Sequence, residues 1–159
     1  MWVLDALNGL PKEFAVFSAA ALPLFEVRGS VPLGFYLGLP AHKILLLSFL
    51  GSVLPALPLF WFLNFMTERL RKINAFDRFF GWLFARSRAK SALIEKYETL
   101  GLTLFIAVPL PGTGVWTGVV AAYLLGLSWL EVAIAASVGT FIAASFLTLA
   151  GLGLIKLFI

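Results

Sequence analysis

Apolar segments of two lengths follow one another along the chain. Two runs are long: Ile44–Met66 holds 23 residues without a charge, and Val132–Ile155 holds 24. A helix needs about 20 apolar residues to cross a bilayer, so each long run predicts one transmembrane helix. Four further runs are too short to cross alone, namely Phe14–Phe25, Val31–Leu39, Leu100–Leu110 and Val115–Leu127.

The short runs come in two pairs, and glycines and prolines interrupt each pair. The first break is EVRGSVP, Glu26–Pro32, and the second is PLPGTGVWTG, Pro109–Gly118. Two interpretations are open, because a pair can be a single kinked span or a re-entrant hairpin that turns back inside the membrane. The several helix disruptors at each break favour the hairpin.

A shift of 88 positions places the first half of the chain on the second half. LPLFEVRGSVPLGFYLGL then aligns with LPGTGVWTGVVAAYLLGL, and the alignment continues as far as Gly51 over Gly139. We therefore interpret 1–159 as one membrane domain that uses a hairpin and a full span twice, over about 14–66 and about 100–159.

The composition agrees with a membrane protein and orients it. The chain is 61% hydrophobic and 13% charged, which is about half the charged fraction of soluble domains. Residues 67–99 hold 8 of the 12 Lys and Arg residues. The positive-inside rule therefore places this connector on the cytoplasmic side of the cytoplasmic membrane. Span one then ends inside and span two begins inside, which predicts an inverted-topology repeat.

The connector also shows helical spacing of apolar residues, from Ile73 to Phe84, among many basic residues. This pattern favours an amphipathic helix that lies on the membrane surface, and a solvated linker is the alternative. The chain has no cysteine and one histidine, so disulfides are excluded and we expect no metal site. Because no catalytic constellation or nucleotide-binding loop is present, we expect no enzyme activity and no cofactor.

Two charges stand inside the first break. An arginine at the bilayer centre costs about 2.5–3.5 kcal/mol on insertion scales, so Arg28 at this depth marks a substrate path. Glu26 lies two positions earlier, where burial favours its protonated form and the Arg28 charge favours the carboxylate. We interpret Arg28 as an anion-binding residue and Glu26 as a proton-coupling residue, and a purely structural ion pair is the alternative.

Both breaks carry the residues of a helix start. Ser30 is a good N-cap and Pro32 suits the first helical turn. Thr113 or Thr117 can fill the same role in the second half. The first N–H groups of a helix point at whatever lies in front, so two such starts and one guanidinium predict a phosphate or carboxylate site. The candidate substrate-binding residues are Arg28, Gly29, Ser30, Gly112, Thr113, Gly114 and Thr117.

At these two breaks the chain resembles a known family. FEVRGSVPLGFYLGL and PLPGTGVWTG are similar to the two signature stretches of the small multidrug export protein family, which is placed near the DedA-like, or VTT-domain, membrane proteins. The resemblance implies two re-entrant hairpins packed with spanning helices. The family name implies drug export, whereas DedA-like proteins are implicated in moving lipids such as polyprenyl phosphates. Those relatives carry basic residues near the second hairpin, and this chain has no charge from Leu100 to Leu130.

The sequence thus predicts an all-α integral membrane protein that uses an ion gradient to transport or flip an anionic lipid phosphate of the polyprenyl-phosphate type. The alternative is a small exporter of cationic hydrophobic compounds, in which Glu26 is the counter-charge. A membrane scaffold without transport is a third interpretation. Two spans and two hairpins leave much apolar surface uncovered, so we expect a homodimer with membrane lipid as its partner and no nucleic acid.

Overall fold

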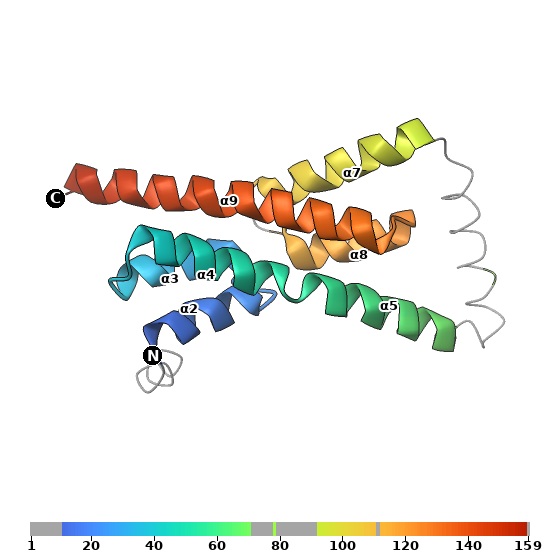
Figure 1. Ribbon diagram of the computed structural model, residues 1–159, viewed down its shortest axis with the longest axis horizontal. Coiled ribbons are helices and arrows are strands. Elements are labelled where there is room, and N and C mark those ends of the chain that lie inside the picture. Colours follow the sequence, from blue (N-terminus) through green and yellow to red (C-terminus); the bar gives the residue numbers. More distant parts are fainter. Residues whose placement is uncertain (1–10, 71–77, 79–91, 111, 159) are drawn as a thin grey trace. The chain divides into compact units, whose positions relative to one another are not determined.

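The structure is a computed structural model that describes residues 11–70, 78, 92–110 and 112–158. All regular structure in this part of the chain is helical, as Figure 1 shows, and the all-α prediction is confirmed. The helices are α2 (Lys12–Ala21), α3 (Glu26–Tyr36), α4 (Ala41–Val53), α5 (Ala56–Leu70), α7 (Ala92–Ala107), α8 (Val115–Leu125) and α9 (Trp129–Phe158).

Two stretches are long and apolar enough to cross a membrane: Ala41–Arg69, which contains α4 and α5, and Trp129–Gly153 in α9. This confirms the two predicted long helices. Both begin three residues earlier than the predicted runs, because polar residues such as His42 and Glu131 belong to the first helical turn. The Glu131 carboxylate accepts hydrogen bonds from N and Oγ of Ser128, at 2.7 and 2.8 Å, and so closes the start of α9.

The first pair of short helices, α2 and α3, turns back on itself. Lys12, at the start of α2, donates a 2.9 Å hydrogen bond from Nζ to the carbonyl oxygen of Leu37, just past the end of α3. Lys43 of α4 forms a 3.0 Å ion pair with Glu13. The hydrogen bond that Lys43 donates to the Glu13 carboxylate lowers the pKa of Glu13. The start of α2, the end of α3 and the start of α4 therefore lie at one end of the hairpin.

The break between α2 and α3 does not lie where the sequence predicted it. The chain turns at Leu22–Phe25 and α3 begins at Glu26, so the predicted break Glu26–Pro32 is wrong. Pro32 lies inside α3, where its missing N–H removes one helical hydrogen bond. The helix forms in spite of this loss because it buries side chains such as Val27 in the core.

The second pair, α7 and α8, is also closely packed. An added Cβ at Gly118 of α8 would come within 2.8 Å of the Ile106 side chain of α7. Because α8 begins at Val115, the predicted break Pro109–Gly118 is too long at its C-terminal end. Gly112 in this break has a φ of +85°, a left-handed conformation that glycine adopts without the steric cost of a Cβ.

The chain divides into two compact units that do not follow the order of the sequence repeat. Unit 1 comprises Met1–Leu54 and Thr140–Ile159, and unit 2 comprises Pro55–Gly139. Each unit therefore holds one pair of short helices, the first part of the long helix that follows the pair, and the last part of the other long helix. The division of the first long helix falls at Pro55, between α4 and α5.

In each unit a glycine lets the long helix approach the first short helix. An added Cβ at Gly51 of α4 would collide with the carbonyl oxygen of Phe17 in α2. An added Cβ at Gly139 of α9 would lie 2.7 Å from the carbonyl oxygen of Thr103 in α7. The shift of 88 positions aligns these two glycines, and each one brings the long helix against the backbone of the first short helix of its unit.

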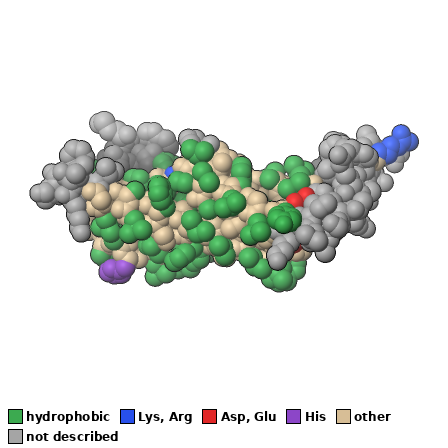
Figure 2. Space-filling model, turned by 90° about the horizontal axis from the view of Figure 1, so that it is seen from above, with side chains coloured by type: hydrophobic (Ala, Val, Ile, Leu, Met, Phe, Trp, Pro, Cys, Tyr) green, Lys and Arg blue, Asp and Glu red, His purple; other side chains and the backbone are tan. Residues whose placement is uncertain are grey.

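The exterior of the described helices is apolar. Leu24 is 91% exposed, and Trp61 and Phe146 are each 59% exposed. Figure 2 shows hydrophobic side chains over much of the described surface on one face. Large exposed apolar areas are unusual for a soluble monomer and are the normal exterior of a protein surrounded by lipid.

The predicted amphipathic connector, 67–99, lies largely outside the described residues. Its described ends are helical, because α5 continues to Leu70 and α7 begins at Ala92. Near the first end, the guanidinium of Arg69 lies 4.9 Å from the centre of the Phe65 ring. Its membrane-surface helix and its cytoplasmic location stay predictions.

Candidate functional site

Glu26 and Arg28 meet in the first turn of α3. Arg28 donates a hydrogen bond from one terminal nitrogen, Nη1, to Oε2 of Glu26 at 2.8 Å. Side chains two positions apart in a regular helix point in different directions. Glu26 has a φ of +44°, outside the helical region, and this backbone conformation lets its carboxylate reach Arg28. The contact between the two charges therefore comes with a strained backbone conformation at Glu26.

The two members of the pair differ in exposure. The Glu26 side chain is 6% exposed and the Arg28 side chain is 22% exposed. A carboxylate this deeply buried is costly unless a cation compensates its charge, and Arg28 supplies that cation. The N-terminal end of α3 also favours a negative charge at Glu26. The pair is therefore neutral as a whole, with its acid inside and its base nearer the surface.

Ser30 is not the N-cap that the sequence predicted. It lies within α3, is fully buried, and donates a 2.8 Å hydrogen bond to Oγ of Ser48 in α4. The neighbouring Gly29 has a packing role, since an added Cβ would lie 2.6 Å from the Phe25 ring. The predicted helix start at Ser30 is therefore wrong, because α3 begins at Glu26; the anion-binding role of Arg28, Gly29 and Ser30 stays a prediction.

The threonines of the second break do not cap α8 either. Thr113 donates from Oγ1 to the carbonyl oxygens of Val108 and Leu110, at 2.7 and 2.9 Å. Thr117 lies inside α8 and bonds back to the carbonyl of Gly114 at 3.4 Å. The N-cap of α8 is Gly114, which makes no side-chain cap hydrogen bond. Whether the two breaks together form one site stays a prediction.

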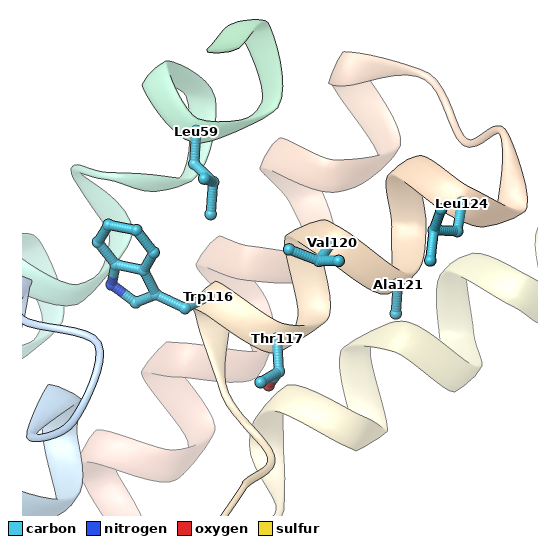
Figure 3. A pocket seen from close by; sticks show the side chains of 6 residues that line it. All are labelled: Leu59, Trp116, Thr117, Val120, Ala121 and Leu124. Carbon is cyan, nitrogen blue, oxygen red and sulfur yellow. The ribbon is translucent and has the colours of Figure 1, made fainter. Parts of the chain in front are cut away.

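Unit 2 contains a pocket that the sequence analysis missed. Its volume is about 390 Å³, and Leu59 of α5 faces side chains of α8 across it (Figure 3). Thr117, a predicted site residue, lines this pocket. The α8 residues of the pocket recur at intervals of four in the sequence, and this spacing could have indicated that they share one face of a helix. The lining residues are Leu59, Trp116, Thr117, Val120, Ala121 and Leu124.

A buried pair of hydroxyl groups in unit 1 has no counterpart at the aligned positions of unit 2. In unit 1, Ser30 and Ser48 are fully buried and bonded to each other. The shift of 88 aligns them with Gly118 and Ala136, which are buried in unit 2 without any hydroxyl. Small side chains are thus sufficient for packing at these positions, and the hydroxyls of unit 1 add polarity that packing does not require.

This arrangement allows two kinds of chemistry at the ion pair. A cation that binds Glu26 would replace Arg28, and an anion that binds Arg28 would replace Glu26. Within the described residues, no group of three His, Asp or Glu side chains lies together in a way that could hold a metal ion.

Comparison with known proteins identifies a family. No curated protein and no solved structure matches the chain. A family model described as "Putative small multi-drug export protein" matches residues 26–146, which include the ion pair, α8 and most of the spans. This match covers well over half of the chain, and together with the two long apolar helices it shows that the chain is a membrane protein of the small multi-drug export family.

Proposed function

We propose that the chain exports small hydrophobic cations in exchange for protons, and that Glu26 binds the cation and the proton in turn. The observation that carries the proposal is the ion pair of a 6% exposed carboxylate with Arg28. Charged groups at membrane depth are rare and tend to mark a substrate or proton path. The family description supports export of small compounds over the lipid phosphate that the sequence analysis preferred.

Competition for one carboxylate couples the two flows. In the resting protein the Arg28 cation compensates the charge of the buried Glu26 carboxylate. A proton or a cargo cation on Glu26 neutralises the carboxylate, so that Arg28 no longer serves as its counter-charge. Arg28, as the more exposed partner, can then withdraw toward water while Glu26 stays buried. Because Glu26 carries one of the two ligands at a time, each inward proton is linked to an outward cation.

The pocket of unit 2 supports a hydrophobic cargo. Its walls are apolar apart from Thr117, and its size lies within the range of small-molecule sites. In α8, Ala121 contributes only a methyl group to the pocket lining. We propose that this pocket binds hydrophobic transported compounds, for which burial of apolar surface supplies the affinity.

A transporter or flippase of a polyprenyl-phosphate-like anion is the second candidate. Arg28 is the more exposed member of the pair, and a guanidinium is well suited to bind phosphate. The start of α8, at Gly114, also lacks a side-chain cap and could add N–H donors. In this second candidate function, the lipid phosphate binds Arg28, and Glu26 then takes up a proton.

We also propose the finer architecture: two re-entrant hairpins in an inverted repeat, within a homodimer in the cytoplasmic membrane. The hydrogen bond from Lys12 to Leu37 supports a hairpin, since a kinked span would separate those two ends. The matching make-up of the two units supports the repeat, because each combines a hairpin with parts of both long helices.

A thermal-shift experiment on detergent-purified protein tests the cargo. Ethidium, a polyprenyl phosphate and the uncharged polyprenol are compared on wild type, Glu26→Gln, Arg28→Ala and Ala121→Leu. We expect ethidium to raise the melting temperature of wild type and Arg28→Ala but not of Glu26→Gln. The shift is smaller in Ala121→Leu, whose side chain fills the pocket. It is also smaller at about pH 5 than at about pH 8, because protons compete for the carboxylate.

Other outcomes separate the candidates. Stabilisation by polyprenyl phosphate alone, lost in Arg28→Ala, would replace the cation proposal with the lipid-phosphate one. Equal stabilisation by the phosphate and the alcohol would show binding of the apolar chain only and would contradict both. An ethidium shift that persists in Glu26→Gln would remove Glu26 from the mechanism.

A further inference from the structure

Two buried threonine hydroxyls in unit 1 have no hydrogen-bond partner among the described residues. They belong to Thr140 and Thr148 of α9, which are 1% and 4% exposed. A threonine in a helix commonly bonds to the carbonyl one turn earlier, as Thr103 does with Thr99 at 2.8 Å. Buried hydroxyls are normally satisfied by protein or by ordered water, so these two call for a partner.

Both threonines lie on the face of α9 that packs against the ion-pair segment. Thr140, Ala144 and Thr148 are four residues apart in succession, so they share one face of α9. Ala144 packs in one buried cluster with Val27, the residue between Glu26 and Arg28. The two threonines therefore lie one helical turn before and one turn after the contact of α9 with the ion-pair segment.

Their spacing excludes a shared ion and favours water. Eight residues of helix correspond to about 12 Å, far more than the width of one coordination sphere. A water molecule, in contrast, needs only a few polar partners, and successive waters can link groups at this separation. The residues between the threonines include Ala143 and Ala144, which have small side chains and are fully buried.

We infer that Thr140 and Thr148 hold a file of ordered water along α9, and that this water carries protons to and from Glu26. The inference deepens the proposed function, on which it rests, by assigning the proton route. In that route a hydrated proton passes along the file and bonds to one carboxylate oxygen of Glu26. The Arg28 guanidinium then loses its partner and keeps its own charge.

Glu26 is the proton acceptor that this route reaches. Arg28 is the charged neighbour on its own helix. On α2 the charged residues are Lys12 and Glu13, which are tied to Leu37 and Lys43 at the far end of the hairpin. On α4 they are His42 and Lys43, at the start of that helix. The stretch of α9 from Val132 to Ile155 contains no ionisable residue.

The test measures how fast Glu26 takes up a proton, which requires no cargo. Purified protein is acidified in a stopped-flow infrared instrument, and the protonated-carboxyl band of Glu26 is assigned by its absence in Glu26→Gln. Valine replaces threonine with little change of shape. In the double variant Thr140→Val/Thr148→Val, we expect Glu26 to take up a proton about tenfold more slowly. Loss of one or two hydrogen bonds that stabilise the proton in transit would raise the activation free energy by enough to give this change.

Three controls make the result specific. Thr103→Val, which removes a hydroxyl already bonded to its own helix, should leave the rate unchanged, and Thr140→Ser/Thr148→Ser should restore it. If the valine double variant does not fold, the rates of Thr140→Ala/Thr148→Ala and Thr140→Ser/Thr148→Ser are compared instead, because these two variants also differ in the presence of the hydroxyl groups. An unchanged rate, an equal effect of Thr103→Val, or a carboxyl band that never appears would overturn the inference. Failure of ethidium to bind would contradict the proposed function alone.

Discussion

At the scale of single residues, the Glu26–Arg28 pair places two charges in a largely buried site, which is costly without mutual compensation. Each charge is acceptable only because the other compensates it, and Glu26 adopts a φ of +44° to make the contact. The sequence identified both residues, because charges within apolar runs are visible without a structure. It could not predict the left-handed backbone at Glu26, which depends on how α3 packs against its neighbours.

The residue-scale prediction concerns removal of Arg28. Arg28→Ala leaves a buried carboxylate without its cation and should destabilise the protein by about 3 kcal/mol near neutral pH. The loss should be smaller at about pH 5, because protonation removes the uncompensated charge. Thermal unfolding at both pH values measures the effect.

A double variant is the matched control for this prediction. Glu26→Gln/Arg28→Met removes both charges and keeps similar volume, so it should recover most of the stability lost in Arg28→Ala. Equal stability of Arg28→Ala and wild type at both pH values would contradict the compensating role of the pair.

At the scale of helices, close contact with the backbone of a neighbour decides which small residues matter. Gly51 and Gly139 each bring a long helix against a carbonyl of a short one, whereas an added Cβ at Gly101 would meet nothing within 4 Å. Sequence analysis aligned Gly51 with Gly139 through the repeat, but it could not tell a glycine in close contact from a glycine in open space.

The element-scale prediction follows from this difference. Gly51→Ala and Gly139→Ala should each destabilise the protein by about 1–3 kcal/mol, because the long helix must move away from the carbonyl. Gly101→Ala, the control within α7, should be neutral or stabilise by up to about 1 kcal/mol through helix propensity. Melting temperatures in detergent measure all three, and equal effects at the three positions would contradict the packing role.

At the scale of the whole molecule, the order of compact units differs from the order of the sequence. Unit 1 contains the end of α9, which lies in the second half of the chain, together with α2, α3 and α4 from the first half. Unit 2 contains α5, from the first half of the chain, together with α7 and α8 from the second half. Periodicity and repeat alignment describe segments in chain order, and they carry no information on which distant segments pack together. Polarity is also divided between the units, with the ion pair and the buried serine pair in unit 1 and the apolar pocket in unit 2.

The whole-molecule prediction concerns membrane topology. The chain has no native cysteine, so single cysteines can be labelled with a membrane-impermeant maleimide. Pro11→Cys and His42→Cys should react from outside the cell, since α2–α3 is proposed to return to its own side. Ser87→Cys and Trp129→Cys should react only after the cytoplasmic side is made accessible. Labelling of Pro11→Cys and His42→Cys on opposite sides would replace the hairpin with a kinked span.

The sequence by itself determined the all-α class, the two long apolar helices and the two charges, Glu26 and Arg28, among the short apolar runs. These properties depend on composition and hydrophobicity over short stretches, which act locally. Tertiary structure alone decided that α3 begins at Glu26, that Ser30 bonds to Ser48, and that α5 and α8 form a pocket. Each of these depends on contacts between residues far apart in the chain, whose combined burial outweighs the local signals of Gly29 and Pro32.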